Sequence, residues 1–101
     1  MGKYVVIYSG LPSANADRGA VTAAWKRWFE GLGDAVLDAG NPFAAGKSVA
    51  EDGSVSEGGT HELTGYSILR ADDLTAAAEM VEGCPGLVNA TIDVYETIPF
   101  G

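Results

Sequence analysis

The sequence predicts an α+β domain in which two helices cover one face of a four-stranded antiparallel sheet. Two segments repeat apolar residues at helical spacing. Four short segments are instead built around β-branched, aromatic or alternating residues, as strands are. Because the order is strand, helix, strand, strand, helix, strand, both helices can lie on the same side of the sheet.

Composition indicates one globular domain, residues 1–101, with 47% hydrophobic residues. Fourteen acidic residues against six basic ones give a net charge of −8, which disfavours nucleic acid and anionic membranes as partners. We therefore expect neither. No apolar run is long enough to span a bilayer. The single cysteine, Cys84, excludes an intrachain disulfide and predicts a cytoplasmic location.

The first strand is predicted over Lys3–Ser9, with Tyr4, Val6 and Tyr8 on one face and Val5 and Ile7 on the other. A long helix should follow, capped by Asp17 and ended by Gly40. Its apolar positions repeat at helical spacing: Val21, Trp25, Phe29, Leu32 and Val36. Gly31 and Gly33 each cost about 1 kcal/mol relative to alanine and indicate a kink or a close backbone approach.

A weak second strand is predicted over Phe43–Ala50, and the polar stretch Glu51–Glu62 should form the hairpin connection to a third strand, Leu63–Arg70. The last strand is predicted over Thr91–Ile98.

The second helix has clear boundaries. Either Asp72 or Asp73 can cap its N-terminus, and Gly83 and Pro85 end it. The residues between them form an apolar stripe of Leu74, Ala77, Ala78 and Val81.

We expect the two helices to cover Val5, Ile7, Ile92 and Val94. The opposite sheet face should then carry six large side chains: Tyr4, Val6, Tyr8, Tyr66, Ile68 and Tyr95. So much aromatic surface predicts a partner, and a homodimer with sheet packed on sheet is the simplest one.

Several stretches resemble the YCII-related (DGPF-type) family of dimeric α+β barrels. They are LDAGNP at residues 37–42, GYSIL at 65–69, ADDLTAAAEMVEGCP at 71–85 and IDVYETIP at 92–99. The resemblance implies a ferredoxin-like βαββαβ protomer and a dimer. Some family members have been proposed to use a His–Asp pair with its histidine on the first helix. That helix has no histidine here, and the Asp-Gly-Pro-Phe signature is missing before the third strand, so no catalytic pair is carried over.

Five residues are candidates for binding a substrate: Tyr8, Trp25, His61, Tyr66 and Asp93. His61, the only histidine, could serve as a base on a lid or could be a solvated loop residue. Asp93 could be an acid–base group among tyrosine hydroxyls or part of a hydrogen-bonded polar cluster. Trp25 could line a pocket or belong to the core.

Two functions stay open at this point. One is a small dimeric binding or accessory protein of unassigned activity. The other is a cofactor-independent enzyme, isomerase-like or monooxygenase-like, acting on a small aromatic or lactone-like molecule. In either case we expect no cofactor, because the glycine spacing lacks a phosphate-binding pattern and no cluster of metal ligands accompanies His61.

Overall fold

The computed structural model describes residues 2–10, 18–58, 63–87 and 90–100. Two short 3₁₀ turns accompany the helices and strands, at Gly33–Ala35 and Pro85–Leu87. The elements in chain order are β1 (Gly2–Ser9), α1 (Arg18–Leu32), β2 (Val36–Asp38), β3 (Lys47–Val49), β4 (Val55–Glu57), β5 (Leu63–Ala71), α2 (Leu74–Val81) and β6 (Ile92–Glu96). Neither helix of this described part has the length and apolarity needed to cross a membrane.

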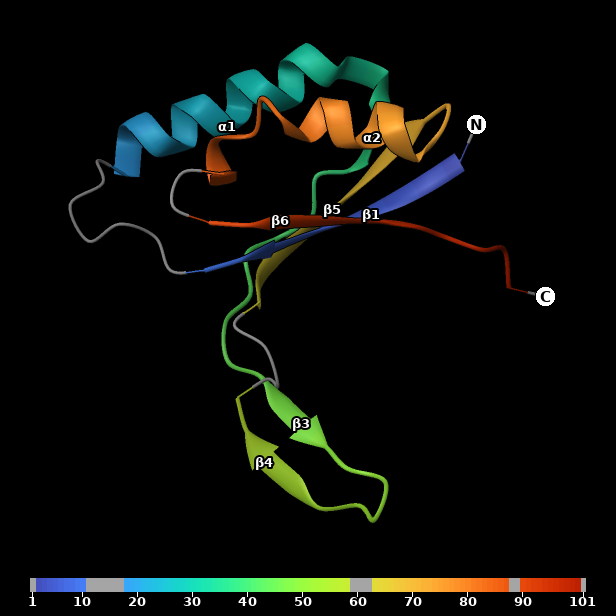
Figure 1. The fold of residues 1–101 in the computed structure, drawn as a ribbon. Helices are drawn as coiled ribbons and strands as arrows, with labels where there is room; N and C mark the ends of the chain where they lie inside the picture. The colour runs from blue at the N-terminus through green and yellow to red at the C-terminus, as the bar shows by residue number, and fades with distance from the viewer. Residues whose placement is uncertain (1, 11–17, 59–62, 88–89, 101) are drawn as a thin grey trace.

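Four strands form one antiparallel sheet in the order β2-β5-β1-β6. β1 and β5 pair along nearly their whole length, from Gly2 opposite Ala71 to Tyr8 opposite Gly65. Both helices lie on the same side of this sheet (Figure 1). The predicted α+β class is confirmed, and the arrangement is compatible with a ferredoxin-like fold.

The core lies between the sheet and the helices. Val6 and Leu69 are fully buried and pack with Val81 and Cys84. Ala77 is also fully buried, because a helix of small residues can lie close to the sheet. Asp73 caps α2, since its carboxylate accepts a hydrogen bond from the Ala76 N–H at 2.7 Å. The structure thus chooses Asp73 over Asp72 as the cap.

The predicted faces of β1 were wrong, whereas those of β5 and β6 are confirmed. Tyr4 and Val6 are buried under the helices, and Tyr8 packs against the same core. Val5 and Ile7 therefore point to the other face, because successive side chains alternate. The register sets this choice: Tyr4 lies opposite Leu69 and Val6 opposite Ser67, both buried.

The end of the first helix and the second strand also differ from prediction. α1 stops at Leu32, and Gly33 takes a left-handed conformation with φ +56°. The chain then forms β2, which joins the edge of the sheet beside β5. The predicted second strand, Phe43–Ala50, contributes only β3, which pairs with β4 outside the main sheet. Asp17, the predicted cap of α1, lies outside the described residues.

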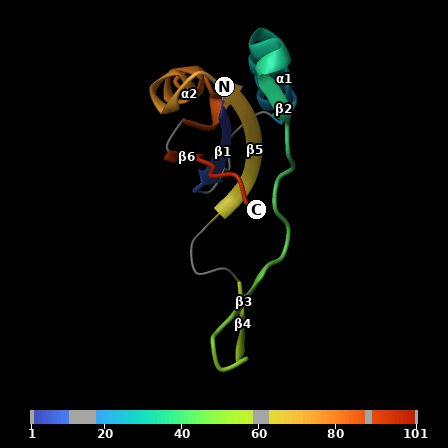
Figure 2. The same ribbon diagram turned by 90° about the vertical axis from the view of Figure 1, so that its right-hand side faces the viewer.

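The β3–β4 hairpin projects away from the body on the side of the sheet opposite to the helices (Figures 1 and 2). We call residues 46–58 the arm. Its base is closed by a hydrogen bond from the Gly58 N–H to the Gly46 carbonyl, at 2.9 Å. Its tip turns at Asp52, whose carboxylate accepts a hydrogen bond from the Ser54 N–H at 2.8 Å.

Candidate functional site

Tyr8 and Trp25, two of the five predicted site residues, lie together under the helices. Their ring centroids are 5.0 Å apart in an edge-to-face arrangement. The Tyr8 hydroxyl donates a hydrogen bond to Ser67 Oγ at 2.7 Å, and Ser67 in turn donates to the Ala39 carbonyl at 2.6 Å. This chain of hydrogen bonds satisfies the polar atoms that β5 and β1 bring into the core.

Burial keeps the two titratable groups of this region, Tyr8 and Cys84, in their protonated form. It raises the pKa of Tyr8 to about 12, although the hydrogen bond with Ser67 acts in the opposite direction. It also raises the pKa of Cys84 to about 11, with a partly opposing contribution from the Gly86 N–H. Both groups are therefore protonated at neutral pH, so Tyr8 is a hydrogen-bond donor and Cys84 is an unreactive thiol.

The aromatic stripe of α1 packs against the core through Trp25 and Trp28. Trp25, Trp28 and Phe29 contact one another, with ring centroids 4.9 to 5.8 Å apart. Trp28 also ties the helices together, because its Nε1–H donates to the Met80 carbonyl at 3.0 Å. Trp25 stands close to the turn after α2, where a Cβ on Gly86 would lie 3.0 Å from its ring. Packing thus accounts for the stripe, as the core interpretation of Trp25 requires.

Tyr66 and Asp93 lie on the opposite face of the sheet. Both are directly opposite Ile7, one from β5 and the other from β6. Their backbones are therefore two strand spacings apart, roughly 10 Å. Asp93 is exposed, and Tyr4 and Tyr8 point to the other side. The structure therefore does not support the alternative in which Asp93 is an acid–base group among tyrosine hydroxyls, because that alternative depended on the inverted face of β1.

Tyr66 instead makes contacts that its sequence pattern does not predict. Its hydroxyl donates to Asp38 Oδ2 at 3.2 Å, and the Phe43 ring stacks on it with centroids 6.0 Å apart. Asp38 is itself held by the Gly40 N–H, which donates to Oδ1 at 2.9 Å. We call Asp38, Phe43 and Tyr66 the edge cluster. An Asx turn over Asp38–Gly40 was the one available signal, hidden by the prediction of a helix there.

The five predicted residues therefore do not form one site. Tyr8 and Trp25 lie on the helix side, Tyr66 and Asp93 lie on the other side, and His61 lies outside the described residues. Within the described ranges, no three His, Cys, Asp or Glu side chains are grouped as a metal site requires.

The geometry offers two chemically distinct surfaces. The helix side holds a packed, hydrogen-bonded core. The other side carries an aromatic and aliphatic face, bordered by the edge cluster. Comparison with known proteins adds no assignment, because neither the protein-family models nor the curated proteins contain a match for this chain.

Proposed function

We propose that this protein is a small homodimeric binding protein in which a second copy covers the sheet face away from the helices. The observation that carries the proposal is the apolar character of this face, which we call the open face. Its central residues are Val5, Ile7, Tyr66, Ile68 and Tyr95. Tyr95 is 60% exposed, and the others are only partly buried. Contiguous apolar surface of this kind is typical of an interface.

Charge favours a second copy as the partner. Lys3 and Arg70 lie opposite each other at one end of the open face. Asp93 and the Asp38 carboxylate lie beside the central residues Ile7 and Tyr66, about four positions along the strands from Lys3 and Arg70, and make that part of the face anionic. A twofold axis parallel to the sheets and perpendicular to the strands would bring each cationic end against the anionic part of the other copy. The face is thus self-complementary, as an isologous dimer requires.

Two further features belong to the same proposal. The strand order β2-β5-β1-β6 with both helices on one face supports a ferredoxin-like protomer, a dimeric α+β barrel and the resemblance to the YCII-related family. The buried free thiol of Cys84 supports a reducing compartment such as the cytoplasm.

The proposed ligand is a small aromatic molecule bound beside the edge cluster. Phe43 is 46% exposed, so its ring offers a stacking surface next to the Tyr66–Asp38 hydrogen bond. The same hydrogen-bonded pair supports the second candidate, a cofactor-independent enzyme acting on a small aromatic or lactone-like substrate. In that case Asp38 would accept a proton from Tyr66 as the Tyr66 oxygen takes one from the substrate.

The dimer is tested by placing a charge in the middle of the open face. Ile7→Lys should convert a dimer to a monomer in sedimentation equilibrium at micromolar concentration, because it buries an unpaired ammonium group. Thr75→Lys adds the same charge on the exposed side of α2 and should leave the dimer intact. A monomeric wild-type protein at these concentrations would contradict the proposal.

Ligand binding is tested by thermal unfolding against small aromatic acids, lactones and quinones. A ligand at ~100 times its dissociation constant adds about 2.7 kcal/mol of apparent stability. Phe43→Ala should abolish the shift, whereas Tyr66→Phe keeps the ring and should only reduce it. Turnover of a ligand that is lost in Tyr66→Phe while binding is kept would favour the enzyme.

A further inference from the structure

We propose that the arm packs against the second copy of the dimer and contacts it near the cationic end of that copy's open face. This inference rests on the proposed dimer, and it assigns to the arm a role in holding the dimer together. Its basis is the stability, direction and charge of the arm.

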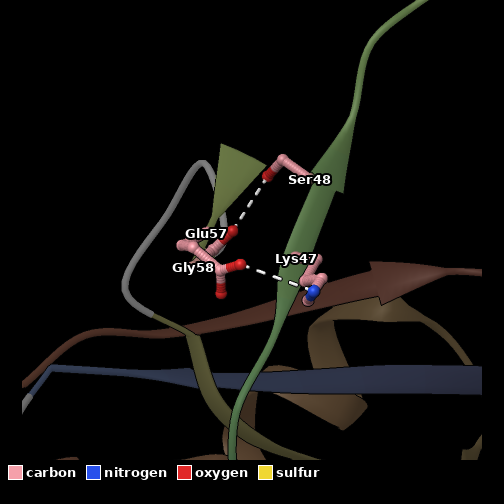
Figure 3. Close-up of polar contacts among 4 residues, drawn as sticks. All are labelled: Lys47, Ser48, Glu57 and Gly58. Carbon is pink, nitrogen blue, oxygen red and sulfur yellow. Dashed lines mark hydrogen bonds and ion pairs between the residues drawn. The ribbon is translucent and has the colours of Figure 1, made fainter. Parts of the chain in front are cut away.

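The arm is a poor candidate for an independent structure. In the described part of the chain, β3 and β4 form their own two-stranded sheet, and such hairpins are marginally stable alone. Val49 and Val55 face each other across it and are 72% and 57% exposed. Two of its side-chain contacts are a Lys47–Glu57 ion pair at 3.4 Å and a hydrogen bond from Ser48 Oγ to the Gly58 carbonyl at 3.2 Å (Figure 3). Both contacts are exposed, so they stabilise the hairpin little.

The direction of the arm points to the same partner as the open face. The arm projects from the open-face side in both views (Figures 1 and 2). The chain as a whole has a radius of gyration of 15.0 Å. A compact chain of this length has about 13 Å. Packed sheets lie about 10 Å apart, so a second copy on the open face would lie beside the arm.

Charge indicates which part of the second copy the arm meets. The arm carries Glu51, Asp52 and Glu57 against one Lys47, which gives three negative charges and one positive charge. The chain re-enters the sheet at Leu63, at the end opposite to Lys3 and Arg70. In the antiparallel dimer, each acidic arm therefore reaches the cationic end of the other copy. A parallel dimer would instead place two acidic arms at the same end.

The open face alone is too small for a stable interface, so the arm would have to add contact area. The four strands have three, nine, eight and five residues, which at about 3.3 Å per residue and about 4.8 Å between strands span roughly 400 Å². This flat area is about half of the ~800 Å² per partner of a stable interface. The exposed valines of the arm would supply apolar area that the flat face lacks.

Removing the arm tests the inference directly. Because the Gly58 N–H bonds to the Gly46 carbonyl, residues 47–57 can be replaced by Asn-Gly, a two-residue hairpin turn. The armless protein should keep its cooperative thermal unfolding. Its dimer dissociation constant in sedimentation equilibrium should rise at least tenfold. A dimer as tight as the wild type would overturn the role of the arm and leave the open-face dimer standing.

Charge reversal at the tip gives a second test that keeps the hairpin. Glu51→Lys, which leaves the Asp52 carboxylate of the tip in place, should weaken the dimer severalfold, because like charges would meet Lys3 and Arg70. Glu79→Lys makes the same change in net charge on α2 and should have no effect. Equal dissociation constants for the two variants would contradict docking at the cationic end. A wild-type monomer would overturn the dimer itself, which the Ile7→Lys comparison reports separately.

Discussion

Tyr8 has a geometry that would suit a catalytic group, but its role in this structure is to stabilise the core. Its hydroxyl lies within 2.7 Å of Ser67 Oγ, a geometry that also suits proton transfer. However, burial raises its pKa to about 12, so it holds its proton across the physiological range. The hydrogen bond then satisfies a buried polar pair, and Trp25 packs against the ring.

The raised pKa of Tyr8 predicts a loss of stability at alkaline pH. In the unfolded chain the phenol releases its proton near its ordinary value of 10.0, whereas the folded protein holds it to about 12. The unfolded state therefore binds fewer protons in this window, and the free energy of unfolding falls as pH rises from 10.0 to about 12. Cys84 extends the effect to lower pH, because burial raises its pKa from 9.0 to about 11.

Urea unfolding at a series of pH values measures this loss. Tyr8→Phe should be less stable than the wild type at neutral pH by about 1 kcal/mol, the contribution of one hydrogen bond. It should also lose less stability between pH 10.0 and about 12, because Tyr8 no longer contributes beside Cys84 and Tyr4, whose pKa values burial also raises. Parallel pH profiles for the two proteins would contradict the assignment.

At the scale of elements, β2 depends on one glycine. Gly40 has φ +75°, and a Cβ there would overlap the Tyr66 carbonyl oxygen of the neighbouring strand. Gly33, after α1, also has a positive φ of +56°, but a Cβ there would meet no atom within 4 Å. Both positions require the left-handed backbone that glycine adopts easily. Only Gly40 also lies too close to a neighbouring strand to accommodate a Cβ.

This pair of glycines makes a matched prediction. Gly33→Ala should cost about 1 to 2 kcal/mol, the strain of a left-handed alanine. Gly40→Ala should cost at least ~3 kcal/mol, because the backbone of β2 must also move away from β5. Denaturant unfolding of both variants measures the difference. If both variants lost the same free energy of unfolding, β2 would be able to move away from β5 without a loss of stability, and the prediction would be wrong.

The sequence predicted those elements that carry their own pattern. β5, α2 and an aspartate cap, at Asp72 or Asp73, follow from alternation, helical spacing and capping chemistry. β2 could not be found, because three residues carry no period and the helical pattern ran on through Val36. The arm was expected only as a connection, since nothing local reveals where a hairpin points.

The candidate site could not be predicted fully, because the sequence does not show which face of β1 meets the helices. Both faces of that strand are apolar, so alternation alone cannot tell which one meets the helices. Pairing with β5 decides it, and pairing is a property of the folded sheet. The structure divides the candidate residues between the two sides of the sheet: Tyr8 contacts Trp25, while Tyr66 and Asp93 belong to the other side.

At the scale of the whole molecule, the proposed dimer makes stability depend on concentration. If the open face and the arm are buried only in the dimer, mass action stabilises the folded state as the protein concentration rises. The thermal midpoint of the wild type should therefore increase over a hundredfold range of concentration. Ile7→Lys should unfold at one temperature throughout. A wild-type midpoint that does not change would contradict coupling between folding and association.

The placement of the two tryptophans has a consequence for spectroscopy. Both lie on α1 and face the core, where Trp25 meets Tyr8 and Trp28 bonds to Met80. The aromatic side chains of the open face and its edge are tyrosines and a phenylalanine. Tryptophan emission will therefore follow unfolding of the helix layer, while tyrosine emission also senses events on the open face. Fluorescence from a single sample can therefore distinguish unfolding from dissociation of the dimer.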